Sequence, residues 1–367
     1  MPPPAVSAHL ASSPRSSALP LGLSLVSTVD WLPEELHPVA MRLARADQLA
    51  FELAEVALAW SRGPDDAGAL SLRQVERKPG YLDVEIATIR PVPPIAAMLF
   101  SEAVHHLRSA IDNVVFYMVA QDRREPLTRE QARAVSMLIY EQPEKFESKV
   151  KRLVRRQGLP EFDPAATLGK RIASLQPFND EAMVPAIPPA LAFMMGGPEP
   201  AVAHPLVLLR DYSNEDKHRT IRLAAGRSLV QRPDDWGRSV GLGMRHVEVG
   251  TVIEQVKKGV LTGVEVSPAL HVQRPDDGVW VSPGPELDAL ARHVSDIVIP
   301  TLVTGMALPE ALPAAVDLSD TGESLVNRLV RGGSTRAHDR ARALSLKAYL
   351  EAMEQDVKFP LITSEFD

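Results

Sequence analysis

The stretch PPIAAMLFSEAVHHLRSAIDNVVFYMVAQ, residues 93–121, decides the fold class of this chain. Its two leading prolines suit the first turn of a helix, because proline lacks the N–H that this turn leaves unpaired. Apolar residues then recur at steps of three and four, which places them on one helix face. These residues are Ala97, Phe100, Val104, Leu107, Ile111, Val114 and Met118. The pattern predicts a long helix that packs against other helices.

The residues on the N-terminal side of this helix show two further patterns. Residues 38–60 repeat apolar side chains at threes and fours and predict a second amphipathic helix. Residues 70–75 and 81–89 instead alternate apolar and polar side chains, with the turn residues Lys78-Pro79-Gly80 between them. This alternation predicts a β-hairpin between the two helices.

The residues on the C-terminal side change period twice. From Arg219 to Ser282, short runs containing Val, Leu and Thr alternate with turns, which indicates an antiparallel sheet. Within it, the segment Val230–Asp235 recurs as Val272–Asp277, and each copy ends in Pro-Asp-Asp, a turn former. The remaining predicted helices begin after the N-cap Thr128 or span residues 146–156, 205–217, 285–306 and 334–357.

Together these elements predict an α+β fold, with a helical-bundle core, an N-terminal β-hairpin and an antiparallel β-rich insert. We expect four regions along the chain. They are a disordered or surface-draped arm over residues 1–30, a helical domain over 31–218 with its hairpin at 70–90, an antiparallel β region over 219–283, and C-terminal helices over 284–367.

Composition excludes several classes of site. The chain of 367 residues has no cysteine, which excludes disulfides, thiolate zinc sites, iron–sulfur clusters and a cysteine nucleophile. Its formal net charge of −7 gives no global attraction to nucleic acid or to an anionic membrane, so a polyanion site must be a local patch. No apolar run approaches the ~18 residues that span a bilayer. We therefore expect a cytoplasmic protein that does not enter a membrane.

Two polar clusters are candidates for chemistry. His105, Arg108 and Asp112 stand at i, i+3 and i+7 on the long helix and form a stripe beside its apolar seam. The segment Asn214-Glu-Asp-Lys-His-Arg219 lies where a helix is predicted to end and a strand to begin. Charges at the edge of a helix interface are partly buried and need partners. If the clusters meet, a histidine, an arginine, a lysine and carboxylates converge.

The strings Glu102-Ala-Val-His-His-Leu-Arg-Ser-Ala-Ile-Asp-Asn113 and Asn214–Arg219 resemble an actinobacterial protein family. That family pairs an HxLRSA(L/I)D helix with an NxxDKHR segment, and the resemblance covers roughly residues 38–225. The combination is also similar to HEPN domains, helical bundles that often act as ribonucleases in toxin–antitoxin and antiviral systems. The resemblance implies a metal-independent ribonuclease without a cofactor, which commonly forms its site at a homodimer interface.

This chain departs from the HEPN signature, in which about four to six residues separate an arginine from a histidine. Seven residues separate Arg210 from His218. Arg331 and His338 have the right spacing, but they lie in a segment rich in Gly and Ser.

In the ribonuclease hypothesis, His218 acts as general acid or base on the ribose hydroxyl or the leaving oxygen. Basic side chains stabilise the charge on the phosphorane, and polar side chains orient the reacting groups. The charge stabilisers are Arg219, Lys217 and Arg108, and the orienting groups are Asn214 and Asp112. RNA is the expected partner, and its phosphates are expected to contact the basic residues Lys149, Arg152, Arg155 and Arg156.

Two alternatives remain open. In the first, the polar clusters are structural ion-pair networks, and the protein is a non-enzymatic scaffold that binds a protein partner. In the second, Glu102-x-x-His105 and Glu215-x-x-His218 supply the Glu-x-x-His pairs that helical bundles use to bind two metal ions. The variant His218→Ala separates the ribonuclease from the scaffold, because it abolishes activity in the first and lowers stability in the second.

Overall fold

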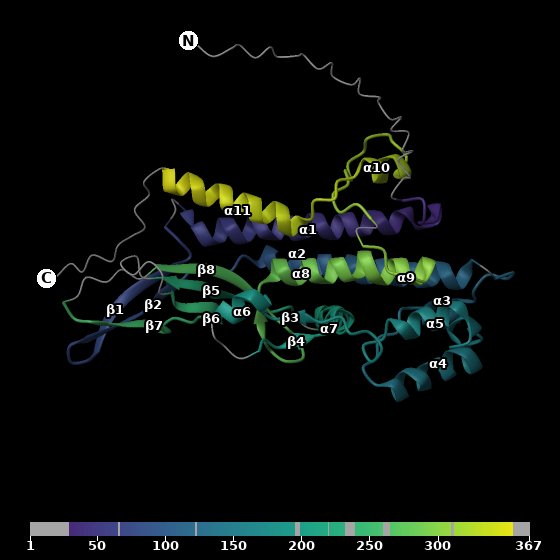
Figure 1. The fold of residues 1–367 in the computed structure, drawn as a ribbon, viewed down its shortest axis with the longest axis horizontal. Helices are drawn as coiled ribbons and strands as arrows, with labels where there is room; N and C mark the ends of the chain where they lie inside the picture. The colour runs from purple at the N-terminus through teal and green to yellow at the C-terminus, as the bar shows by residue number, and fades with distance from the viewer. Residues whose placement is uncertain are drawn as a thin grey trace, which may run out of the picture.

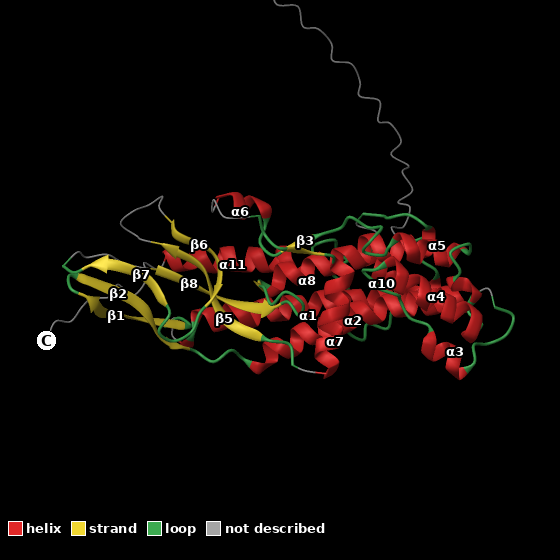
Figure 2. Ribbon diagram, turned by 90° about the horizontal axis from the view of Figure 1, so that it is seen from below, coloured by secondary structure: helices red, strands yellow, loops and turns green. Residues whose placement is uncertain are grey.

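The computed structural model confirms the α+β class: long helices run along the molecule, and antiparallel sheets lie toward one end of it (Figures 1 and 2). It describes residues 29–64, 67–121, 123–194, 199–218, 220–231, 239–259, 265–309 and 312–354. The predicted N-terminal arm lies outside the described residues except for its last two positions. Among the described residues, no helix combines the length and the apolar character that a bilayer span requires.

The core is built on the two predicted long helices, α1 (His37–Arg62) and α2 (Pro94–Ala120), which run antiparallel. Trp60 is buried near the end of α1 and donates its indole N–H to the carbonyl oxygens of Arg90 and Pro91, at 3.2 and 3.1 Å. This contact fixes the end of α1 against the start of α2. The central residues of the predicted seam are buried: Phe100, Val104, Leu107, Ile111 and Val114.

Later helices complete the bundle around α2. α8 (Pro283–Arg292) continues through a π-helical segment (His293–Val298) into α9 (Ile299–Thr304) as one rod below α1 in Figure 1. α7 (Pro205–His218) packs on α2, where the rings of Tyr212 and Phe100 meet edge to face at 5.0 Å. Along α1 lies α11 (Ala337–Glu354), which begins three residues later than expected from Ser334. α10 (Leu325–Arg331) was not predicted.

The short helices gather mainly at the end of the bundle opposite the sheets (Figure 1). They are η1 (Glu34–Leu36), α3 (Arg129–Ala134), α4 (Pro143–Gln157), η3 (Pro160–Phe162), α5 (Thr167–Ser174) and, nearer the sheets, α6 (Pro189–Met194). The predicted cap of α3 is confirmed, because Thr128 Oγ1 accepts the Gln131 N–H at 3.2 Å and the Gln131 side chain accepts the Thr128 N–H at 3.0 Å. Arg171 on α5 donates to two carbonyl oxygens of α9 at 2.9 Å and ties this end to the bundle.

All strand pairs are antiparallel. One sheet has the order β1-β2-β7, a second has β6-β5-β8-β9, and β3 pairs with β4. The strands are β1 (Leu70–Lys78), β2 (Tyr81–Ile89), β3 (Val184–Pro185), β4 (Val202–Ala203), β5 (Leu223–Gln231), β6 (Ser239–His246), β7 (Val252–Lys257), β8 (Glu265–Gln273) and β9 (Trp280–Val281).

The predicted hairpin is confirmed, and its turn places Gly80 at φ +81°, a conformation that suits glycine. The single sheet expected over residues 219–283 is divided in the structure. β7 is not in the sheet of β5, β6 and β8, which flank it in the sequence. It pairs instead with β2, where Leu82 is opposite Val256. The hairpin and the insert therefore share a sheet. Of the two Pro-Asp-Asp turns, the one at 233–235 lies outside the described residues, and the second follows β8.

Candidate functional site

Arg108 and Asp112 bind the backbone N–H and C=O of Met137, in the segment that leads into α4. Arg108 Nε donates to Asp112 Oδ2 at 3.2 Å, and its Nη2 donates to the Met137 carbonyl oxygen at 2.8 Å. The Met137 N–H donates to Asp112 Oδ1 at 2.8 Å. The pair thus forms two hydrogen bonds to the backbone of a buried residue, in addition to its own ion pair. This geometry anchors residues 135–141 to α2.

We call Arg108, Asp112 and their contacts with Met137 the clamp. The other predicted residues of the two clusters lie apart from it. His105 is exposed and contacts Ser109 at 3.4 Å. Asn214 and Lys217 are exposed on the last turns of α7. The His218 side chain and Arg219 lie outside the described residues. Within the part of the chain that the structure describes, no hydrogen bond or ion pair joins Asn214 or Lys217 to the clamp.

The proposed dinuclear metal pairs are also separated where they are described. Glu102 faces Arg45 at 4.0 Å, and the described residues include no ligand group that brings Glu102 or His105 together with Glu215. The spaced pair Arg331 and His338 falls on two different helices, α10 and α11. No single helix therefore presents those two side chains as the HEPN signature does.

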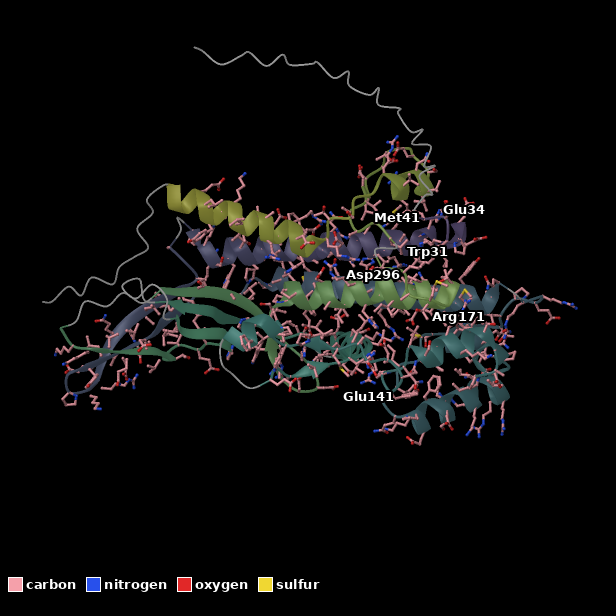
Figure 3. The ribbon with its side chains drawn as sticks, viewed as in Figure 1. Trp31, Glu34, Met41, Glu141, Arg171 and Asp296 are labelled. Carbon is pink, nitrogen blue, oxygen red and sulfur yellow. The ribbon has the colours of Figure 1, made fainter. Side chains whose placement is uncertain are left out.

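α4 carries the predicted basic residues on one face. The neighbouring face of the helix buries Phe146, Val150 and Leu153 against the core. The cations Lys145, Lys149, Arg152 and Arg156 follow at i, i+4, i+7 and i+11, which is one stripe of an α-helix, and Arg155 flanks it. The side chains of this region project away from the bundle (Figure 3). α4 is therefore an amphipathic helix with a cationic outer face.

This face lines a groove of about 640 Å³, which we call the basic groove: Tyr140, Glu144, Lys145, Ser148, Lys149, Lys151, Arg152, Arg155 and Arg156. Lys151 pairs with Glu147 at 3.5 Å. Among the residues that the structure describes, the other five cations have no carboxylate within ion-pair distance. Burial and the neighbouring Arg152 lower the pKa of Lys149. The groove therefore concentrates positive charge.

Gln176 fixes the rim of the basic groove. This fully buried side chain accepts the Tyr140 N–H at 3.0 Å and donates to the Leu138 carbonyl oxygen at 2.8 Å. Together with the clamp at Met137, these bonds make the backbone that carries Tyr140 a fixed edge. The half-buried Tyr140 side chain is thereby held beside the cations.

A second polar cluster next to the groove is acidic. Arg210 on α7 donates to Glu141 at 2.8 Å and to Asp211 at 2.6 and 2.9 Å; Figure 3 shows Glu141 between the bundle and α4. A hydrogen bond with the Asp211 carboxyl, partial burial and charge repulsion raise the pKa of Asp276 to about 6. The adjoining cleft, about 320 Å³, also contains Glu215 and Asp277. These carboxylates are unfavourable neighbours for phosphates, in contrast to the cations of the basic groove.

One further group was not predicted. Asp180, His204 and His293 are the described residues whose side chains gather as a metal could require. Asp180 and His204 are 24 positions apart, and His204 and His293 are 89 positions apart, so no local motif joins the three residues. One sequence feature could have indicated this group: His293 lies on the buried face of its predicted helix, next to the apolar residues Leu290 and Val294.

Neither a family model, nor a curated protein, nor a solved structure matches this chain. The resemblance of the sequence to the actinobacterial family and to HEPN domains therefore stays a prediction. What the chain does must be argued from the clamp, the basic groove and the buried groups themselves.

Proposed function

We propose that this protein binds single-stranded RNA through the basic groove of α4. The observation that supports the proposal is the gathering of five cations without acidic partners, among the described residues, in one groove of a chain with net charge −7. Such a concentration of like charge is unfavourable by itself, and a polyanion relieves it. The carboxylates of the neighbouring cleft repel phosphates, so we expect the RNA backbone to lie along α4 and not along that cleft.

The shape and composition of the groove favour a single strand. From Lys145 to Arg156 the cationic stripe runs about 16 Å along the helix, at about 1.5 Å per residue. Phosphates bound along it would release condensed counterions, which drives sequence-independent binding. Tyr140 at the fixed rim offers a ring on which an unpaired base can stack. Duplex RNA keeps its bases stacked inside the helix and does not present them in this way.

Cleavage of the bound RNA is the stronger form of this proposal. Arg108 Nε and Nη2 and both Asp112 carboxylate oxygens already bind each other and the Met137 backbone, which commits the pair to a structural contact. A catalytic role therefore falls to His218, with Lys217 and Arg219, as the sequence predicts. Incubation of RNA with the protein in EDTA, beside His218→Ala, tests this step. Activity that His218→Ala retains would exclude His218 as the acid or base.

The binding step is tested by fluorescence anisotropy with a labelled single-stranded RNA of mixed sequence. The groove variant combines Lys149→Gln, Arg152→Gln, Arg155→Gln and Arg156→Gln. The control variant removes the same charge from exposed cations elsewhere: Arg62→Gln, Lys170→Gln, Lys257→Gln and Lys347→Gln. Four exposed ion pairs at about 0.5–1 kcal/mol each predict a loss of about 30- to 1,000-fold in affinity for the groove variant.

The control variant should bind RNA as the wild type does, to within about threefold, because long-range charge is screened at physiological salt. Equal losses in the two variants would show that net charge alone governs binding. A wild type that does not bind RNA but binds an acidic polypeptide through the groove would instead support the scaffold alternative.

A further inference from the structure

Three side chains from distant segments converge inside the protein. Asp180 precedes β3, His204 precedes α7, and His293 opens the π-helical segment that follows α8. His204 Nε2 lies 3.4 Å from Asp180 Oδ2, and His293 Nε2 lies 3.7 Å from the same oxygen. All three atoms lie within 4.8 Å of one another. The two imidazole rings stand nearly perpendicular, at 83°, with centroids 5.5 Å apart.

The converging atoms are buried and lack hydrogen-bond partners. The side chains of His204 and His293 are 3% and 4% exposed, and that of Asp180 is 19% exposed. None of the residues that the structure describes forms a hydrogen bond with His204 Nε2, His293 Nε2 or Asp180 Oδ2. Buried polar atoms are nearly always paired, so three such atoms directed at one point indicate a shared partner.

We propose that Asp180, His204 and His293 bind one divalent transition-metal ion, with zinc as the first candidate. An ion bound tetrahedrally by nitrogen and oxygen at about 2.1 Å separates its ligand atoms by about 3.4 Å. The measured separations from Asp180 Oδ2, 3.4 and 3.7 Å, match this value. Two imidazoles and one carboxylate also form a donor set that borderline metals prefer and that calcium and magnesium do not.

The backbone at His293 supplies an independent observation. Residues His293–Val298 form a π-helical turn between α8 and α9. π-Helical turns are rare and occur frequently at functional sites, where the extra residue changes the direction of side chains. Here the turn begins at the histidine that faces Asp180. The departure from α-helical geometry and the ring nitrogen without a hydrogen bond among the described residues therefore occur at the same residue, His293.

Metal binding has a defined consequence at His204. In the metal-free protein the Leu206 N–H donates to His204 Nδ1 at 3.1 Å, which places the proton of the neutral ring on Nε2. When Nε2 binds the ion, the Nε2 proton would be released to solvent and Nδ1 would take up another, so that the ring stays neutral with no net change in protons. The Leu206 N–H then loses its acceptor. One hydrogen bond is small against metal coordination, so the exchange favours the bound state.

The test uses the full-length protein after treatment with a chelator. Zinc chloride is titrated into wild type, Asp180→Asn and His293→Gln by calorimetry, and zinc content is measured after dialysis. His271→Gln is the matched control, because His271 is also fully buried with both ring nitrogens unpartnered and lies outside the group. We expect one zinc per wild-type and control chain, and at least about 100-fold weaker binding in the two ligand variants.

A readout besides affinity comes from hydrogen exchange at the Leu206 amide, which should become faster when zinc is added to the wild type. Absence of zinc uptake by the wild type would overturn the proposal, whatever the variants do. Equal uptake by wild type and by correctly folded ligand variants, judged by circular dichroism, would overturn it as well. RNA binding by the basic groove does not enter this experiment, so the two proposals fail separately.

Discussion

Replacement of Asp112 tests whether the polar stripe of α2 is structural. Asp112→Ala removes the acceptor of the Met137 N–H and the ion pair with Arg108. Met137 is 2% exposed, so its unpaired N–H costs about 1–3 kcal/mol. The ion pair is partly exposed, at 17% for Arg108 and 32% for Asp112, and contributes up to about 1 kcal/mol. We therefore expect the free energy of unfolding to fall by about 1–4 kcal/mol.

The matched variant is Asp112→Asn, whose carbonyl oxygen still accepts the Met137 N–H while the charge is lost. It should lower the free energy of unfolding by no more than about 1 kcal/mol. Urea unfolding followed by far-UV circular dichroism measures both variants at pH 7.5. Asp112→Ala within about 0.5 kcal/mol of the wild type would refute the structural role. If that stable variant also lost RNA affinity, Asp112 would belong to the binding site instead.

Three other predictions concern buried or shifted groups. Glu286→Ala leaves the Arg274 guanidinium, 0% exposed, without its counter-charge and should cost about 3–5 kcal/mol in urea unfolding; a cost below about 1 kcal/mol would contradict the pairing. The folded-state pKa of Asp276, about 6, lies above the ordinary 3.8, so the stability it contributes below pH 4 is lost as pH rises through 6. Asp276→Asn should therefore raise the melting temperature more at pH 8 than at pH 4, and equal gains would argue against the acid pair. Burial lowers the pKa of His271 to about 4, below its ordinary 6.5, so stability falls as pH drops from 6.5 through 4. His271→Leu should reduce that acid loss between pH 7.5 and 5, and an unchanged loss would exclude His271 as its source.

The helices and the hairpin were predictable because their signals are local. The seam of α2 has the helical period in consecutive residues, and the hairpin has alternation on both sides of Gly80. The pairing of β7 with β2 was not predictable, since strand partners depend on how the chain closes through space. The same holds for α10, a single short helix within a segment rich in proline and glycine.

The candidate sites divide in the same way. The basic face of α4 is a periodic signal, and the structure places its cations along one groove. The ion pair of Arg108 and Asp112 is local too, but its target is the backbone of Met137, 25 positions beyond Asp112, and no side-chain pattern marks that position. Asp180 and His293 meet only because α8, α9 and the segment before β3 pack together.

The salt dependence of RNA binding tests the central claim most directly. The slope of log affinity against log salt is about −0.7 for each phosphate that a single strand has neutralised, so contacts by the five groove cations that have no ion pair among the described residues predict a slope near −3.5 for the wild type. The groove variant, which lacks Lys149, Arg152, Arg155 and Arg156 but keeps Lys145, should have a slope near −0.7, while the control variant keeps the wild-type slope. The same slope in all three proteins would show that RNA does not bind at the α4 groove.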